Sequence, residues 1–297
     1  MNDNAKALIA LMTTIVFWAS AFVGIRIGLM CYSPGGLALL RFLVASVFMA
    51  LIYVRLPHRT RLTKRETLRA IIAGVTGLGI YNIALNFGEQ SVDAGTSSFI
   101  VAQAPVLTTL LAVIVLREPI TRIGILGLCV SILGVCLIAF GQIHHFAGFN
   151  RGLLYVLLAV LMSASYVTAQ KPLLKKIHPI EMSAYAIWIG ALMMLVFTPA
   201  MLHDVVRAPW RATLDVIYLG IFPGAIAYVT WSYGLSKIPA NKAVSFMYVM
   251  PLIATLMGWL LLGEIPTTLS ILGGLVAIAG MVMINMQEAI IYRLKAL

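Results

Sequence analysis

Ten long runs of uncharged, apolar residues dominate this sequence and restrict it to a membrane fold. Each run has about 20 residues, the length that a helix needs to cross the hydrocarbon core of a bilayer. Hydrophobic residues make up 61% of the chain and charged residues only 10%, whereas soluble domains average about 45–50% apolar and about 25% charged residues. The sequence therefore predicts an all-α integral membrane protein. The ten expected transmembrane helices cover roughly residues 7–27, 35–55, 68–88, 94–116, 122–141, 152–170, 180–202, 213–234, 241–262 and 267–287.

The distribution of Lys and Arg among the connecting segments predicts the orientation. One alternate set of connections holds 16 of these residues, six of them between Arg55 and Arg69, and the opposite set holds four. Because cytoplasmic loops are enriched in Lys and Arg, we expect a multi-pass protein of a bacterial-type inner (plasma) membrane with both termini in the cytoplasm. These loops also explain the net charge of +11, so we expect contact with the lipid bilayer and none with nucleic acid.

The two halves of the sequence resemble each other at a nearly constant offset. Residues 79–141 align with 225–287 at a shift of 146, and earlier positions align at a shift of 145. Each half carries five spans, an odd number, so the second half must enter the membrane inverted relative to the first. Inverted repeats are typical of secondary transporters. The sequence therefore predicts two inverted five-helix repeats, at residues 1–145 and 146–297.

Several short motifs are similar to those of a known transporter group. They are Phe17-Trp18-Ala19-Ser20-Ala21-Phe22 in the first span, Leu40-Arg41-Phe42 in the second, and the spacing Pro105…Glu118 with its copy Pro251…Glu264. With these motifs, the chain resembles the EamA type of the drug/metabolite transporter superfamily over nearly its whole length. The resemblance implies a ten-helix carrier of amino acids, their derivatives, drugs or other small metabolites.

Polar and aromatic side chains at membrane depth form the candidate substrate site. Such groups are costly in hydrocarbon unless they are paired or face water. Hydrogen bonding between helices, which stabilises the bundle, is their alternative role. As a set they predict a polar cavity between spans one, two, three, four, six, seven, eight and nine, suited to a flat or partly aromatic substrate. The candidate substrate-binding residues are Trp18, Ser20, Arg41, Tyr81, Asn82, Asn86, Gln103, Tyr228 and Tyr248.

Arg41 is the one formal charge clearly inside a predicted span. An intramembrane Arg is a candidate functional residue, and here it could hold the anionic end of a substrate. The alternative is that its long side chain extends toward the outer interface and keeps its charge in water.

Helix-breaking residues recur at matching places in the two halves. Pro105 falls near the middle of span four and Pro251 near the middle of span nine. Each removes a backbone hydrogen bond and kinks its helix. Pro223 in span eight aligns with Gly77 in span three as a second pair. We expect these four residues to shape or gate the cavity, although a kink without function is the alternative.

The sequence contains no recognisable catalytic site. All ten acidic and all five His residues map to loops or helix ends, so proton coupling is not evident, and Glu89 is the only candidate for it. There is no GxxxxGK[ST], HExxH, GxSxG or CxxC pattern, which argues against ATP drive, hydrolase chemistry and a metal site. We expect no enzyme activity, no cofactor and no metal.

The leading hypothesis is a secondary transporter that moves a small organic metabolite, an amino acid or derivative, by alternating access, in the direction of efflux. A multidrug exporter of the same fold is the alternative, and an integral membrane enzyme acting on lipid or a channel is further removed. Spans five and ten carry small residues that permit close helix packing. They could pair within one chain or form a homodimer surface, and these residues are Gly127, Ser131, Gly134, Gly273, Ala277 and Gly280.

Overall fold

The protein is described by a computed structural model that covers residues 3–104, 106–107, 122–145, 150–238, 243 and 246–295. Every regular element within these residues is a helix. The helices of the first half are α1 (Asp3–Gly28), α2 (Pro34–Tyr53), α3 (Lys64–Ala73), η1 (Gly74–Ile80), α4 (Tyr81–Gly88), α5 (Ala94–Val101) and α7 (Arg122–His145). Those of the second half are α8 (Arg151–Leu173), α9 (Pro179–Met194), η2 (Leu195–Phe197), α10 (Thr198–Arg207), α11 (Trp210–Ile221), η3 (Phe222–Ile226), α12 (Ala227–Lys237), η4 (Phe246–Val249), α14 (Met250–Leu262) and α15 (Thr268–Lys295).

Six helical stretches within the described residues are long and apolar enough to cross a membrane. They coincide with predicted spans one, two, three, six, seven and eight, and they are Asn4–Gly28, Pro34–Tyr53, Lys64–Gly88, Arg151–Leu173, Pro179–Arg207 and Trp210–Lys237. Shorter apolar helices coincide with spans five, nine and ten, at Arg122–Ile138, Phe246–Leu262 and Thr268–Gly280. Span four lies partly outside the described residues. The all-helical membrane architecture is confirmed, and the total of ten spans stays a prediction.

The second helix of each half begins in the same way. The side chain of Ser33 accepts a hydrogen bond from Gly36 N at the start of α2, and Pro34 occupies the first helical turn. The side chain of His178 accepts one from Ile180 N at the start of α9, where Pro179 takes the same place. A polar N-cap side chain accepts from a backbone N–H that has no partner within the helix. Proline fits the first turn because it has no N–H that would need a partner. The aligned pairs Ser33-Pro34 and His178-Pro179 thus share a structural role.

Two membrane helices contain π-helical turns at matching positions. Gly77 lies in η1, between α3 and α4, and Pro223 lies in η3, between α11 and α12. A π-helical turn inside an α-helix widens the backbone spiral and is frequent at functional sites. The predicted pair Gly77 and Pro223 therefore marks real irregularities in two helices.

The other predicted pair, Pro105 and Pro251, is seen only in part. Pro105 lies outside the described residues. Pro251 is buried in the first turn of α14, directly after the 3-10 turn η4. In this position its missing N–H costs no helical hydrogen bond. Pro251 therefore stands where a 3-10 turn becomes an α-helix, whereas the sequence placed it in the middle of a span.

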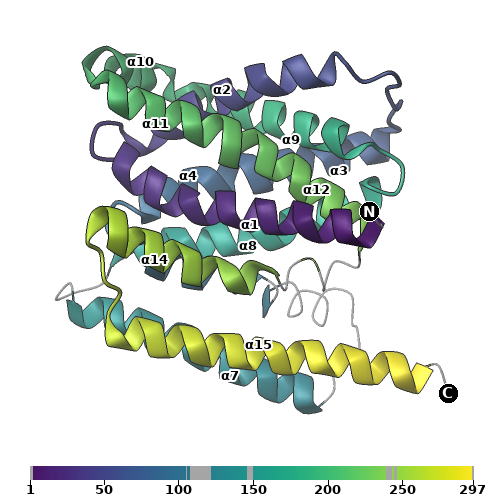
Figure 1. The fold of residues 1–297 in the computed structure, drawn as a ribbon, viewed down its shortest axis with the longest axis vertical. Helices are drawn as coiled ribbons and strands as arrows, with labels where there is room; N and C mark the ends of the chain where they lie inside the picture. The colour runs from purple at the N-terminus through teal and green to yellow at the C-terminus, as the bar shows by residue number, and fades with distance from the viewer. Residues whose placement is uncertain are drawn as a thin grey trace.

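Helices α7 and α15 pack tightly against each other within one chain (Figure 1). A Cβ added at Gly134 would lie 2.5 Å from Gly273 O, and one added at Gly280 would lie 2.5 Å from Gly127 O. Ser131 Oγ donates to Ala277 O over 3.1 Å. The six predicted small residues thus allow two backbones to approach within one molecule, which is one of the two alternatives that the sequence left open.

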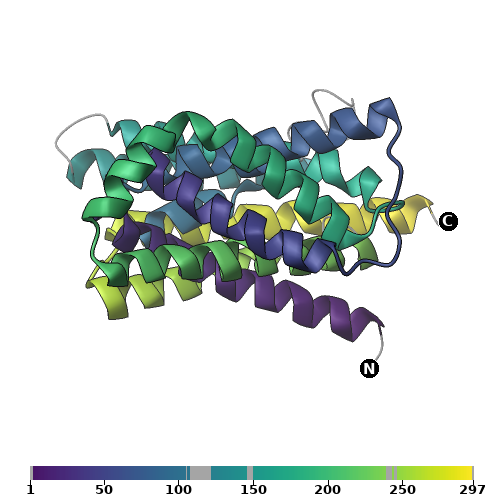
Figure 2. The same cartoon turned by 90° about the horizontal axis from the view of Figure 1, so that it is seen from above.

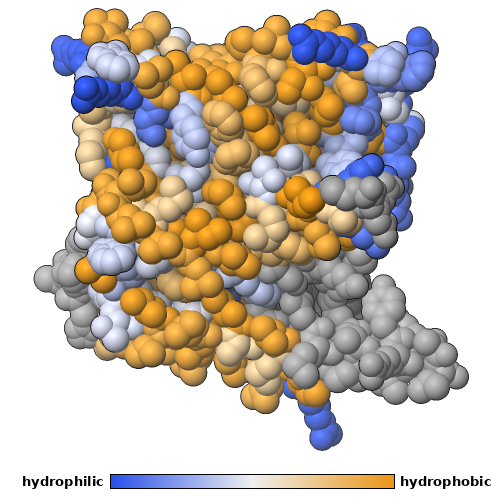
Figure 3. Space-filling model, viewed as in Figure 1, coloured by the Kyte–Doolittle hydropathy of each residue, from blue (hydrophilic) through white to orange (hydrophobic). Residues whose placement is uncertain are grey.

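The ends of the helices carry more hydrophilic residues than the sides of the bundle. Figure 3 shows an apolar flank in the middle of the molecule, with hydrophilic residues gathered toward the two ends of the helices. The start of α1 and the end of α15 lie at the same end (Figures 1 and 2). The basic connection between α2 and α3 lies at that end too. This arrangement gives the molecule one end that carries both termini and an opposite end.

Candidate functional site

A cavity lies among helices of both halves of the chain. It is lined by Trp18, Ala21, Phe22, Arg41, Gly77, Tyr81, Asn82, Leu85, Val101, Ser163, Tyr166, Tyr228, Met247 and Met250. These residues come from α1, α2, η1, α4, α5, α8, α12, η4 and α14. The predicted spans one, two, three, four, six, eight and nine thus contribute to one cavity, and span seven contributes no lining residue.

Six of the residues singled out from the sequence meet in this cavity. They are Trp18, Arg41, Gly77, Tyr81, Asn82 and Tyr228. Asn82 connects the two halves of the chain, because its Nδ2 donates to Tyr228 Oη of the second half over 3.4 Å. Its Oδ1 accepts from Arg41 Nη1 of the first half over 3.3 Å. Nδ2 also donates to Leu78 O at 2.9 Å. The side chain of Asn82 therefore fixes the position of a charged and an aromatic group at once.

The other predicted substrate-binding residues lie elsewhere. Ser20 bonds Tyr218 Oη at 2.7 Å and so joins α1 to α11. Asn86 Nδ2 donates to Pro34 O over 3.0 Å. Gln103 accepts from Ser131 Oγ at 2.9 Å, and Tyr248 packs near Val106. None of the four lines the cavity described above, and the three polar contacts are of the kind that stabilises a helix bundle.

Arg41 is buried, with 2% of its surface exposed. Its Nε donates to Leu219 O over 3.2 Å, and its guanidinium lies 5.4 Å from the centre of the Phe42 ring. The side chain therefore points inward, and the alternative that it extends to the outer interface is wrong. The two acceptors, Leu219 O and Asn82 Oδ1, are neutral, and they use only two of the five N–H groups of the guanidinium.

Aromatic rings surround Arg41 and Asn82. The rings of Trp18 and Tyr228 are 5.3 Å apart at an edge-on angle of 64°, and those of Tyr166 and Tyr228 are 6.0 Å apart at 79°. Edge-to-face contacts of this kind hold rings in fixed orientations. The walls of the cavity are thus mainly aromatic and apolar.

The sequence analysis did not select several of the lining residues, among them three from the second half of the chain. Tyr166 and Ser163 lie on α8, and Met247 lies in η4. The repeat contains a signal for one of them, because Ser163 aligns with the candidate residue Trp18 at the shift of 145. The remaining apolar lining residues, such as Leu85, carry no signal that separates them from ordinary packing residues.

The cavity is contracted in this structure. Its volume is about 30 Å³, which is room for about two water molecules. Sites that enclose small molecules generally have about 300–1,000 Å³. A metabolite can therefore enter only after the surrounding helices or side chains move apart.

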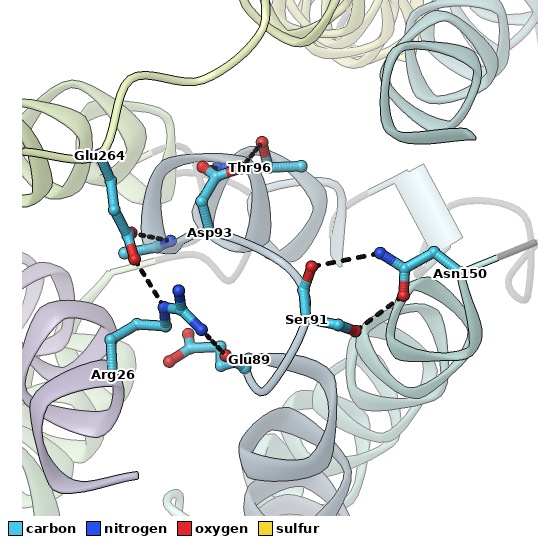
Figure 4. Close-up of polar contacts among 8 residues, drawn as sticks. Arg26, Glu89, Ser91, Asp93, Thr96, Asn150 and Glu264 are labelled. Carbon is cyan, nitrogen blue, oxygen red and sulfur yellow. Dashed lines mark hydrogen bonds and ion pairs between the residues drawn. The ribbon is translucent and has the colours of Figure 1, made fainter. Parts of the chain in front are cut away.

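An ion pair and the hydrogen bonds beside it connect three parts of the chain (Figure 4), at the end of the bundle opposite the two termini (Figure 1). Arg26 Nε donates to Glu264 Oε1 over 2.7 Å, and Arg26 Nη1 donates to the backbone oxygen of Glu89. The second oxygen of Glu264 accepts from Ala94 N over 3.1 Å. These bonds tie the end of α1 to the connections that follow α4 and α14.

Glu89 itself lies beside this ion pair (Figure 4). Its side chain is fully buried, and neither carboxylate oxygen has a hydrogen-bond partner among the described residues. It stands one residue beyond the Lys64–Gly88 span. Burial raises the pKa of the Glu89 carboxyl well above its ordinary value, and the nearby Arg26 opposes this only in part.

A different contact joins helices at the end that carries the termini. Lys171 Nζ on α8 donates to Leu235 O and, over 2.8 Å, to Ile238 O at the end of α12. A cation at a helix C-terminus satisfies free carbonyl groups and complements the helix dipole. The contracted cavity thus lies between polar contacts at both ends of the bundle.

The chain is similar to known transporters over almost its whole length. The EamA-like transporter family matches residues 5–140 and 150–286. A protein of Streptantibioticus cattleyicolor named "Probable terminal-alkyne amino-acid exporter" is 38% identical, covering 95% of this chain and 94% of that protein. The "Uncharacterized transporter YdfC" of Bacillus subtilis is also 38% identical, covering 94% of this chain and 90% of that protein.

A solved crystal structure shows the same fold. It aligns with a TM-score of 0.65 at 16% sequence identity, and the alignment covers 95% of this chain and 98% of the other. At this identity the likeness concerns the fold alone. Together with the family match over both halves, the buried cavity and the apolar helices, it leads to one conclusion. The chain belongs to the EamA-like transporter family and is a multi-pass membrane protein.

Proposed function

We propose that this chain is a secondary transporter that exports a small amino-acid-like molecule across the inner membrane by alternating access. The observation that carries the proposal is the contracted cavity in which the buried Arg41 and several aromatic rings meet. A cavity built from both halves, in a chain of a transporter family, is what a carrier with one central site requires.

The repeat supports the same mechanism. Four aligned pairs of positions line the cavity together, and they are Trp18 with Ser163, Ala21 with Tyr166, Asn82 with Tyr228, and Val101 with Met247. Two inverted five-helix repeats, residues 1–145 and 146–297, would bring matching positions to one central site. Exchange of the two repeat conformations would then open this site to one side and afterwards to the other.

The orientation follows from the charges at the two ends. Both termini and the basic connection between α2 and α3 share one end, which the positive-inside rule assigns to the cytoplasm. The Arg26–Glu264 ion pair then lies on the outer side. It acts as part of an outer gate, because it ties α1 to the connections that α14 and α4 lead into.

The substrate class rests on Arg41 and on a relative. Arg41 can bind a carboxylate through two parallel hydrogen bonds, and a 38% identical protein is named as an amino-acid exporter. That name also supports export as the direction. A charged group fixed by two bonds in a small cavity favours a defined substrate over the broad pocket of a multidrug exporter.

Counterflow in proteoliposomes tests this function. Purified protein is reconstituted with a high internal concentration of one unlabelled amino acid, and uptake of a labelled trace of it is followed without any ion gradient. We expect transient accumulation that saturates with substrate and is absent from protein-free liposomes. Uptake that rises linearly with concentration would indicate a channel, and counterflow driven equally by unrelated drugs would favour the multidrug alternative.

A further inference from the structure

The walls of the central cavity carry charge of one sign. Within the part of the chain that the structure describes, Arg41 is the only formally charged lining residue, and no carboxylate lines the cavity. The polar remainder consists of an amide, an indole N–H, a serine hydroxyl and the tyrosine hydroxyls. A zwitterionic amino acid bound here would therefore find a counter-charge for its carboxylate and none for its ammonium group.

Arg41 has no ionic partner among the described residues. Its acceptors, Leu219 O and Asn82 Oδ1, are neutral. The charges of Glu89 and Asp215 act on it, but neither carboxylate forms an ion pair with it. A buried guanidinium without a counter-ion is unfavourable. A carboxylate that entered the cavity would supply the missing partner and the acceptors for a bidentate pair.

A further donor stands in the same walls. The Nε1 of Trp18 is buried and has no hydrogen-bond partner among the described residues. A carboxylate has two oxygens with about four acceptor positions and no donor. It therefore matches a site whose unsatisfied groups are donors.

An ammonium group would be held more weakly. The lining offers it the aromatic rings of Trp18, Tyr81, Tyr166 and Tyr228 and the hydroxyl oxygens of the three tyrosines. Attraction between a cation and a ring face changes an affinity by about two- to fivefold at a partly hydrated site. Loss of a charge-assisted, two-pronged pair changes it by more than about tenfold.

Resting on the transport function proposed above, we infer that the carboxylate of the substrate is obligatory and its amino group dispensable, so that simple carboxylic acids are a second substrate class. The acid binds with its carboxylate on Arg41 and its carbon skeleton against the aromatic walls. Amines of the same skeleton are rejected, because they would place a second cation beside Arg41.

Three compounds that share a but-3-ynyl chain and differ in whether it carries a carboxylate, an amino group or both separate these roles. They are 2-amino-4-pentynoic acid, 4-pentynoic acid and 3-butynylamine, chosen because a relative is named for a terminal-alkyne amino acid. Dissociation constants are measured from the concentration-dependent thermal stabilisation of the full chain in detergent, since a ligand that binds the folded state raises its stability. We expect the two acids to bind within about fivefold of each other. We expect the amine to bind at least about tenfold more weakly.

Variants then assign the effect to Arg41. Arg41→Gln should lose the response to both acids, and Arg41→Lys should keep part of it because the charge remains. Arg122→Gln, at an exposed arginine remote from the cavity, should respond as the parent does. Should Arg41→Gln fail to fold, the comparison of the three ligands on the unaltered chain still decides.

The inference is overturned if the amine binds as well as the acids, if only the amino acid binds, or if none of the three binds. The proposed function fails by a different result, which is the absence of counterflow with any amino acid. Acid binding without counterflow would support the carboxylate site and refute transport, so the two failures are distinguishable.

Discussion

Replacing Gly77 with Ala should damage both stability and substrate binding. A Cβ at this position would lie 2.5 Å from Tyr166 Cβ and closer still to the ring, whereas carbon atoms normally approach to about 3.5–4.0 Å. Rotation of the Tyr166 side chain cannot relieve a contact with its own Cβ, so η1 and α8 must separate. Overpacking of this kind costs about 1–3 kcal/mol, which corresponds to a fall in Tm of roughly 5–10 °C at the upper end.

Substrate affinity should fall in the same variant, because Tyr166 lines a cavity of only about 30 Å³. The measurements are thermal unfolding in detergent and the substrate concentration for half-maximal counterflow. Gly258→Ala is the matched control, since its Cβ would meet only Ala94 Cβ at 3.8 Å. An alanine there should be neutral or stabilising. Equal behaviour of the Gly77 and Gly258 variants would refute the reasoning.

Three other predictions follow from the structure. Glu89→Gln should remove a pH dependence of stability, because the raised pKa of buried Glu89 stabilises the folded state at low pH and this stabilisation is lost as pH rises through that pKa. The measurement is Tm as a function of pH, and a profile equal to that of the parent would count against the burial of Glu89. Gly134→Leu should lower Tm by separating α7 from α15 while leaving the half-maximal substrate concentration unchanged, and a change confined to that concentration would contradict this. Cysteines placed in residues 58–65 should react with impermeant reagents only from the cytoplasmic side, and labelling in intact cells would reverse the orientation.

Much of the fold could be predicted because the bilayer imposes simple rules. Length and hydropathy located six helices that the structure confirms, among them Asn4–Gly28 and Arg151–Leu173. The repeat also matched Gly77 with Pro223, and both lie in π-helical turns. The positions of the helices depend on local composition, and the pairing of Gly77 with Pro223 follows from the alignment of the two halves. Both can therefore be predicted from the sequence alone.

The candidate site was only partly predictable. Membrane depth selected Arg41 and Asn82, which line the cavity, and also Ser20 and Gln103, which bond to neighbouring helices. Depth does not say which way a side chain points around its helix, and in a bundle every face meets either a helix, the cavity or lipid. Tyr166 was missed for the opposite reason, because an aromatic residue in an apolar span looks like ordinary packing until its neighbours are known.

The central claim, that one cavity opens alternately to the two sides, is tested most directly through a cysteine at Ser163. In a variant whose three native cysteines are replaced, Ser163→Cys is labelled by an impermeant maleimide in right-side-out and inside-out vesicles. The added change Glu264→Gln breaks a partly exposed ion pair of 2.7 Å, which should weaken outer closure by about 1 kcal/mol, or about fivefold in population. The account predicts faster labelling from outside and slower labelling from inside. Faster labelling from both sides, or reaction from one side only in every variant, would contradict it.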